Sequence, residues 1–84
     1  MASITIYSKT TCPYCVAAKA LLKSKGQTYT EINIEVVPGS KEEMIEKSGG
    51  RLTVPQIFIN EMHVGGFDDL RALDEAGKLD PLLK

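Results

Sequence analysis

The chain has 84 residues, 43% of them hydrophobic and 25% charged, and its formal net charge is −1. This length predicts one domain, spanning residues 1–84, and the near-neutral charge gives no indication of nucleic-acid binding. No stretch is long and apolar enough to cross a membrane, and the first residues do not resemble a signal peptide. We therefore expect a monomeric, cytoplasmic protein that binds neither membranes nor nucleic acid.

The first part of the chain predicts a βαβ unit. Alternating β-branched residues predict a strand over 3–8, and similar alternation predicts another over 28–34. Between them a helix is expected over 13–25, ending at Gly26. Its apolar stripe is expected to consist of Val16, Ala17, Ala20, Leu21 and Ser24. Two strands joined by a helix predict parallel pairing with a right-handed crossover.

A second helix is expected over 41–47. Ser40 followed by Glu43 has the spacing of a capping box, in which each side chain satisfies a backbone N–H at the start of a helix. Met44 and Ile45 would be the core residues of this helix, which the glycines after Ser48 would end.

The remaining residues predict a β-hairpin and a last helix. A strand over 56–60 would return through a tight turn as a short strand over 63–64. A helix over 67–77 follows, with a helical turn over 79–83. The order β-α-β-α-β-β-α predicts a small α/β domain with a four-stranded mixed sheet flanked by helices.

The only two cysteines, Cys12 and Cys15, lie at the junction between the first strand and the first helix. The first N–H groups of a helix have no intrahelical partner, and the peptide dipoles place partial positive charge there. A thiolate at this point is stabilised and becomes a nucleophile. Cys15 lies one turn further on the same face, where it can reach Cys12 and is expected to be less exposed. The spacing therefore indicates a redox-active pair.

Three other interpretations of the cysteines remain open. A structural disulfide between them would close a very short loop, which stabilises a fold only weakly. A structural zinc site normally takes four Cys or His ligands, whereas this chain adds only His63, far away in sequence. Two buried, inert cysteines are the third. We expect no metal, and we expect His63 on the surface of the hairpin.

Three motifs together resemble the dithiol class of the glutaredoxins, most closely the small bacterial type. The motifs are Thr11-Cys12-Pro13-Tyr14-Cys15, Thr53-Val54-Pro55 and Gly65-Gly66-Phe67-Asp68-Asp69-Leu70. Their order and spacing fit along the whole chain. The resemblance implies the thioredoxin fold and a glutathione-dependent thiol–disulfide oxidoreductase, an enzyme that reduces protein–glutathione mixed disulfides and protein disulfides.

The resemblance also implies roles around the cysteines. Cys12 matches the nucleophilic cysteine of the family and Cys15 the resolving one. Tyr14 would flank the thiol of glutathione, the reducing co-substrate. Lys9 would favour the Cys12 thiolate and face a glutathione carboxylate, since a nearby cation stabilises negative charge.

The second motif resembles the segment before a cis-proline in the family. If the Val54–Pro55 bond is cis, Pro55 faces the cysteines and the backbone of Val54 is free to pair with the cysteinyl part of glutathione. Thr53 belongs to the same contact. The alternative is a trans proline that merely starts an edge strand.

The third motif resembles the anion site of the family, where a helix N-terminus binds the γ-glutamyl carboxylate. This site would consist of Gly66, Phe67, Asp68 and Asp69. The N–H groups of Phe67 and Asp68 would bind the carboxylate, and an aspartate would bind the ammonium group; simple N-capping by the aspartates is compatible. Lys41 or Arg51 would reach the glycine carboxylate.

Other functions stay open beside this one. A redoxin that is reduced by thioredoxin reductase would share the cysteine pair. A carrier of an iron–sulfur cluster, bound by Cys12 and glutathione, is less in keeping with the Pro13-Tyr14 pair and with two active-site cysteines. A non-catalytic binding module on the same fold is a further alternative. Ribonucleotide reductase is a protein substrate that the family suggests.

Overall fold

The helices and strands follow one another in the order that the sequence predicts. The structure is a computed structural model that describes residues 2–83. Its elements are β1 (Ile4–Ser8), α1 (Pro13–Ser24), β2 (Thr30–Asn33), α2 (Ser40–Lys47), β3 (Gln56–Ile59), β4 (Met62–Gly65), α3 (Phe67–Glu75) and α4 (Leu79–Leu82). The helical turn predicted over 79–83 is α4. Within residues 2–83, no helix has the length and apolar character needed to cross a membrane.

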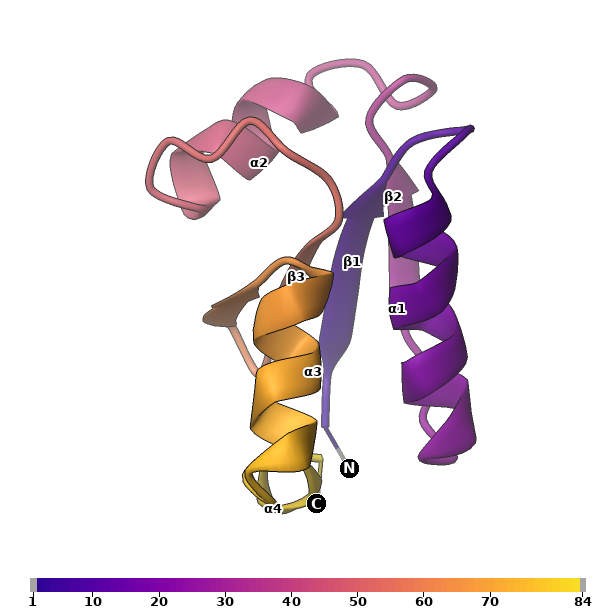
Figure 1. The fold of residues 1–84 in the computed structure, drawn as a ribbon. Coiled ribbons are helices and arrows are strands. Elements are labelled where there is room, and N and C mark those ends of the chain that lie inside the picture. Colours follow the sequence, from indigo (N-terminus) through magenta and orange to yellow (C-terminus); the bar gives the residue numbers. More distant parts are fainter. Residues whose placement is uncertain (1, 84) are drawn as a thin grey trace.

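The four strands form one mixed sheet in the order β2-β1-β3-β4. β1 pairs in parallel with β2 and antiparallel with β3, and β4 pairs antiparallel with β3. The parallel pair is the predicted βαβ unit. Figure 1 shows β1 running through the middle of the molecule, beside α1 and α3. The end of β1 and the start of β3 therefore lie at the same edge of the sheet, where Tyr7 pairs with Gln56.

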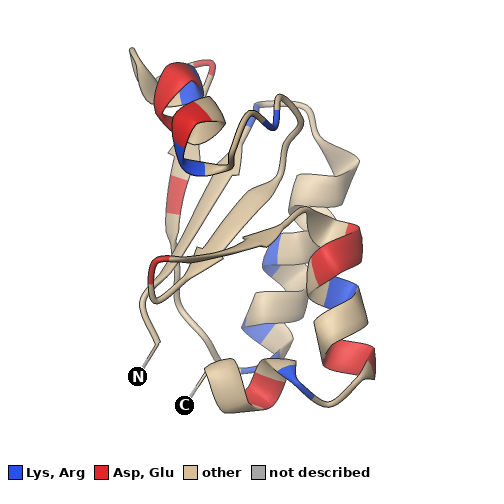
Figure 2. Ribbon diagram, turned by 90° about the vertical axis from the view of Figure 1, so that its left-hand side faces the viewer, with Lys and Arg blue, Asp and Glu red and all other residues tan. Residues whose placement is uncertain are grey.

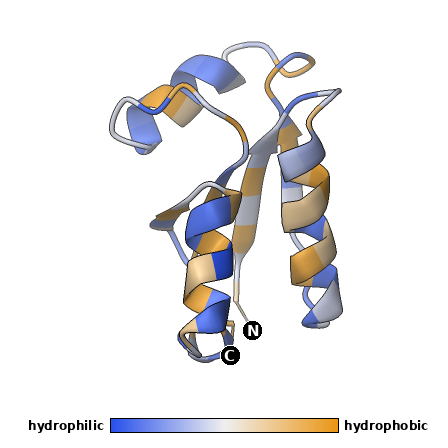
Figure 3. Ribbon diagram, in the orientation of Figure 1, coloured by the Kyte–Doolittle hydropathy of each residue, from blue (hydrophilic) through white to orange (hydrophobic). Residues whose placement is uncertain are grey.

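Helices cover both faces of the sheet. α1 and α3 lie on one side and α2 on the other, as the view in Figure 2 shows. The core beneath α1, α3 and α4 contains Ile4, Ile6, Ala18, Leu22, Ile57, Ile59, Leu70, Leu79 and Leu83. A smaller cluster on the α2 side contains Tyr7, Met44 and Phe58. α2 is mostly hydrophilic, with a short apolar band (Figure 3), so this side of the core is the thinner one.

The turn between β3 and β4 consists of Asn60 and Glu61, whose φ angles are 51° and 69°. Two consecutive positive φ angles are typical of the type I′ turn, whose twist matches that of a β-hairpin. The N–H of Asn60 donates to the carbonyl oxygen of Ser3 at 2.7 Å, and its Oδ1 accepts from the N–H of Ser3 at 2.9 Å. The tight turn predicted at this point is confirmed.

The buried face of α1 differs from the predicted stripe. Cys15, Ala18 and Leu22 are the buried residues of this helix, whereas Val16 is 61% exposed. Alanines occur on several sides of α1, so the sequence pattern leaves its inner face ambiguous. Ala18 and Leu22 join the core cluster with Ile4 and Ile6 of β1, and Cys15 lies on this same buried face of the helix.

The predicted capping box at Ser40 is also wrong. Ser40 is already helical, and the N-cap is Gly39, whose φ of 78° is left-handed. The hydroxyl of Ser40 turns back and donates to the carbonyl oxygen of Val37 at 2.6 Å. The side chain of Glu43 pairs with Lys47 at 2.8 Å instead of reaching the helix start. The left-handed glycine makes the turn that the capping box was expected to stabilise.

A polar cluster joins β1, β2 and α1. Glu31 Oε2 accepts from Lys19 Nζ at 2.9 Å and from the hydroxyl of Ser8, which is fully buried, at 2.7 Å. The hydrogen bond from Lys19, and then that from Ser8, holds the pKa of Glu31 below its ordinary value. The cluster therefore contributes to stability only while Glu31 is ionised.

We expect Glu31→Gln to lower the free energy of unfolding at pH 7 by roughly 0.5 kcal/mol, the usual size for a partly exposed ion pair. Because the pKa of Glu31 is lower in the folded chain, this stabilisation is complete above its ordinary value of 4.5 and is lost as the pH falls through the folded pKa. Urea unfolding of both proteins at pH 7 and at about pH 3 measures the difference. An equal difference at both pH values would contradict this account.

Candidate active site

The two cysteines lie at the start of α1, directly after the loop that follows β1. Cys12 is the N-cap of α1, with extended backbone, and Pro13 is the first helical residue. The N–H of Cys15 donates to Cys12 Sγ at 3.2 Å, so this sulfur occupies the place of the oxygen in an ordinary N-cap. The donor and the helix dipole both favour negative charge on the Cys12 sulfur.

The two thiols differ in exposure. Cys12 keeps 7% of its surface, whereas Cys15 keeps 1%, as the sequence predicts. Burial, and next the hydrogen bond with the Cys12 side chain, raise the pKa of Cys15 to about 12. Both are unbonded thiols in the structure. At neutral pH Cys15 therefore stays protonated, and Cys12 is the sulfur that a disulfide from outside can reach.

The loop before β3 faces the cysteine pair. The Val54–Pro55 peptide bond, which the sequence left open, is cis. Cys12 Sγ lies 3.8 Å from the carbonyl oxygen of Val54, to which its thiol donates. This approach follows from the antiparallel pairing of β1 with β3, which brings the end of one strand beside the start of the other. The loop is thus a wall of the site directly opposite the reactive sulfur.

The start of α3 forms the next wall. Gly66 is the N-cap, and its N–H donates to Asp69 Oδ2 at 2.9 Å, which is half of a capping box because glycine has no side chain to return the bond. Arg51 Nη2 lies 3.5 Å from the same oxygen. The N–H groups of Phe67 and Asp68, at the first two helical positions, have no intrahelical partner and are available to an anion.

These walls enclose a cavity of about 160 Å³. It is lined by Tyr14, Arg51, Thr53, Val54, Pro55, Gly66, Phe67, Asp68 and Asp69. All of these are residues that the sequence analysis assigned to a glutathione site. The rings of Tyr14 and Phe67 lie 6.3 Å apart, with Tyr14 63% exposed, so the cavity opens beside two aromatic side chains.

Lys9 and Lys41 line a neighbouring hollow of about 420 Å³, which shares Thr53 and Val54 with the first cavity. The structure therefore separates the two candidates for a glycine carboxylate, since Arg51 lies in the first cavity and Lys41 in the second. Glu35 also lines this hollow and accepts from the N–H of Thr10 at 2.8 Å. Glu35 carries no local sequence signal of this role, because its link to the active-site loop spans 25 residues.

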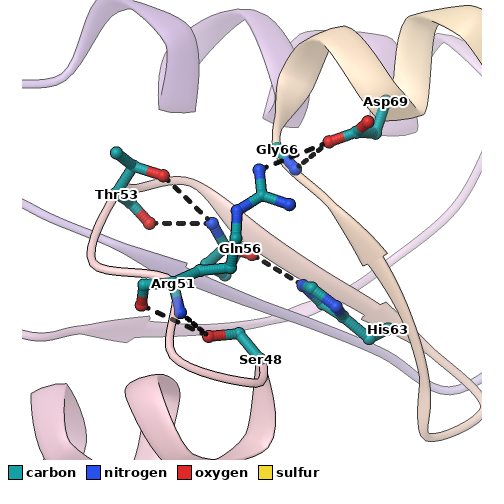
Figure 4. A network of polar contacts seen from close by, with 7 residues as sticks. All are labelled: Ser48, Arg51, Thr53, Gln56, His63, Gly66 and Asp69. Atoms are coloured by element: carbon teal, nitrogen blue, oxygen red, sulfur yellow. Dashed lines mark hydrogen bonds and ion pairs between the residues drawn. The ribbon is translucent and has the colours of Figure 1, made fainter.

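His63 lies on the hairpin, as the sequence predicts, and its side chain also takes part in a partly buried contact. His63 is half-buried, and its Nε2 lies 2.7 Å from Oε1 of the buried Gln56. Gln56 Nε2 in turn contacts the carbonyl oxygen of Thr53 at 3.0 Å, as Figure 4 shows. These hydrogen bonds are not recognisable from the sequence, because Gln56 lies in an apolar run and its partner His63 lies across the hairpin. Within residues 2–83, no three His, Cys, Asp or Glu side chains are grouped so as to hold a metal ion.

An N-capping cysteine, a buried second thiol one turn later and a facing cis-proline define the class of thiol–disulfide oxidoreductases with the thioredoxin fold. The family model "Glutaredoxin" matches residues 4–64. Glutaredoxin 3 of Escherichia coli (strain K12) is 60% identical over 84 residues, covering 100% of both chains. The chain belongs to the glutaredoxin family and is a thiol–disulfide oxidoreductase.

Solved structures agree with this assignment. The solution structure of glutaredoxin from Brucella melitensis has a TM-score of 0.84 and 54% identity, over 98% of this chain and 88% of that one. The crystal structure of the buckwheat glutaredoxin–glutathione complex has a TM-score of 0.89 and 30% identity, over 98% of this chain and 76% of that one. The predicted family and fold class are confirmed.

We expect iodoacetamide at pH 7 to modify Cys12 and to leave Cys15 unmodified in the folded, reduced protein. The reason is that alkylation requires a thiolate, which the raised pKa of Cys15 suppresses. In Cys12→Ser the burial of Cys15 remains, so its alkylation should stay at least about 100-fold slower than that of a free cysteine. Mass spectrometry after timed quenching measures both rates. Comparable labelling of the two cysteines would overturn the assignment of Cys15 as the protected thiol.

We expect Gly65→Ala to lower the free energy of unfolding by roughly 2 kcal/mol. Gly65 has a φ of +117°, and a Cβ there would collide with the Asp69 carboxylate that caps α3. Gly77→Ala is the matched control, since its φ is +72° and a Cβ would meet nothing within 4 Å. The control should lose only about 1 kcal/mol, the conformational cost alone. Equal losses in urea unfolding would show that the Asp69 cap contributes nothing.

Proposed function

We propose that residues 1–84 form one domain that uses glutathione to reduce protein–glutathione mixed disulfides and protein disulfides. Cys12 is the nucleophile and Cys15 the resolving thiol. The single observation that carries this proposal is the position of Cys12 Sγ. It caps α1 and faces the Val54 carbonyl oxygen at 3.8 Å, beside the cavity that the glutathione-site residues line.

The reaction on a mixed disulfide takes two exchanges. The Cys12 thiolate attacks the glutathione sulfur, a Cys12–glutathione bond forms, and the protein thiolate leaves and takes up a proton. The thiolate of a second glutathione then attacks the glutathione sulfur bound to Cys12. Glutathione disulfide leaves and the Cys12 thiolate returns, so each mixed disulfide consumes one reduced glutathione, and the other half of the glutathione disulfide comes from the substrate.

A protein disulfide requires Cys15. Cys12 attacks one sulfur of the disulfide and forms a mixed disulfide with the substrate, while the other substrate sulfur leaves as a thiolate. Cys15 then attacks Cys12, which releases the reduced substrate and leaves a Cys12–Cys15 disulfide. Two glutathione molecules reduce that pair and leave as glutathione disulfide. Two of the causes that raise the pKa of Cys15, the hydrogen bond and the charge interaction with Cys12, belong to the free Cys12 side chain. Both end once that sulfur is covalently bonded. The mixed disulfide thus lowers the pKa of Cys15 at the step in which its thiolate is needed.

The walls of the cavity supply groups that match glutathione. The backbone of Val54 would pair with the cysteinyl part, with Thr53, Pro55 and Tyr14 beside it. The free N–H groups at the start of α3 would bind the γ-glutamyl carboxylate, and the nearby aspartates its ammonium group. The buckwheat glutaredoxin, whose fold matches 98% of this chain, was crystallised in complex with glutathione, and this supports the proposal.

Charged residues around the cavity complete the proposed site. Arg51 in the first cavity, and Lys9 and Lys41 in the neighbouring hollow, would attract the glycine carboxylate. We place the reaction in the cytoplasm, because glutathione is kept reduced there. We further propose that the protein acts as a monomer. Ribonucleotide reductase is one protein substrate that the family suggests.

The test is the turnover of a glutathionylated peptide by reduced glutathione, for the wild type, Cys12→Ser and Cys15→Ser. We expect no turnover from Cys12→Ser and retained turnover from Cys15→Ser, because the reaction on a mixed disulfide uses Cys12 alone. Reduction of a protein disulfide should fail in both variants, since release of that substrate requires Cys15.

Two results would reject this function. If the wild type shows no turnover with glutathione, but thioredoxin reductase reduces its oxidised form, the protein is a redoxin of another kind. Protein purified without oxygen that is brown, and that loses its colour in Cys12→Ser, would indicate an iron–sulfur carrier.

A further inference from the structure

A chain of hydrogen bonds links the β3–β4 hairpin to the loop that carries Thr53 (Figure 4). The side chain of Gln56 is fully buried and forms the middle of this chain. Its Nε2 lies 3.0 Å from the carbonyl oxygen of Thr53 and 3.2 Å from Thr53 Oγ1. Its Oε1 lies 2.7 Å from His63 Nε2. The catalytic assignment above makes no use of Gln56 or His63.

The direction of every bond in this chain is fixed by chemistry. The carbonyl oxygen of Thr53 can only accept, so the amide nitrogen of Gln56 must face it. The amide oxygen then faces His63 and can only accept, so His63 Nε2 must carry a proton. The neutral Nε2–H tautomer and the imidazolium both meet this requirement. The chain therefore persists in either charge state of His63.

His63 is held on a rigid part of the fold. It pairs with Phe58 across the hairpin, and the centres of their two rings lie 5.0 Å apart at an angle of 33°. The bonds from His63 to Gln56 and on to Thr53 thus connect this loop to the sheet. At the other end of the loop, Ser48 Oγ accepts from the N–H of Arg51 at 3.1 Å and contacts its carbonyl oxygen at 3.2 Å.

The segment between these two anchors, residues 51–55, belongs to no helix or strand, yet it carries Val54. The carbonyl oxygen of Val54 lies against Cys12 Sγ, so a shift of this loop moves one wall of the site relative to the reactive sulfur. Thr53 itself lines both the cavity and the neighbouring hollow. The hydrogen bonds of Gln56 thus control the position of residues that would contact glutathione.

We propose that Gln56 and His63 are positioning residues that hold Thr53, and through it the Val54 backbone, in place for the glutathionyl part of the substrate. This inference rests on the proposed use of glutathione. Neither side chain touches the reacting sulfurs, so their loss weakens binding and leaves the chemistry of Cys12 unchanged.

His63 is the better residue to change, because it is only half-buried while Gln56 is fully buried. His63→Phe keeps a flat ring against Phe58 but removes the N–H donor. Gln56 Oε1 then loses its partner in a buried place, and the amide turns away from Thr53 to find another. His63→Gln is the matched control, since its side-chain amide restores an N–H donor at a similar distance from the backbone.

We expect His63→Phe to raise the KM for the glutathionylated peptide about fivefold, the size expected for one lost hydrogen bond, with kcat within about twofold of wild type. His63→Gln should return KM to the wild-type value. The rate of Cys12 alkylation should be the same in all three proteins. Hydrogen exchange of residues 51–55, followed by mass spectrometry, should be faster in His63→Phe and normal in His63→Gln.

The outcomes separate this inference from the proposed function. Unchanged exchange of residues 51–55 in His63→Phe overturns the positioning role whatever the turnover shows. Faster exchange with an unchanged KM overturns it as well, because the loop would then move without effect on binding. A wild type with no glutathione turnover at all rejects the proposed function, and with it the part of this inference that concerns glutathione.

Discussion

The pairing of β1 with β3 is the constraint on which the site depends. Because the two strands are antiparallel, the loop that leaves β1 and the loop that enters β3 meet at one edge of the sheet. Cys12 comes from the first loop, and the cis Val54–Pro55 bond from the second. The start of α3 reaches the same edge, because β4 returns antiparallel beside β3. Three segments that are far apart in sequence thus meet at one edge of the sheet.

The two thiols differ in accessibility because α1 places them at different depths. At the helix start Cys12 keeps a small exposed area and accepts an N–H at its sulfur, whereas the inner face of the helix carries the fully buried Cys15. Burial keeps Cys15 protonated, and the free Cys12 side chain strengthens that effect. Under the proposed function, the order of attack follows from these different depths.

The sequence predicted the order of the elements, the cysteine pair and the loops around it, because these depend on local patterns and short motifs. The predictions from the sequence were wrong where contacts between distant residues determine the structure. The inner face of α1 depends on packing against β1, and the start of α2 depends on the left-handed turn at Gly39. The contact between Gln56 and His63 crosses the β3–β4 hairpin, whose register shifts at Ile57 and Phe58. A periodic pattern contains no record of such a shift.

The small size of the first cavity has a consequence for the choice of substrates. At about 160 Å³ it is well below the volume of a pocket that encloses a whole small molecule. A substrate larger than this volume extends beyond the cavity, which is bordered by the exposed Tyr14 and by the neighbouring hollow. Under the proposed function, the recognised fragment is the same tripeptide on every glutathionylated protein. This site would then select for the glutathionyl group and would not distinguish between the proteins that carry it.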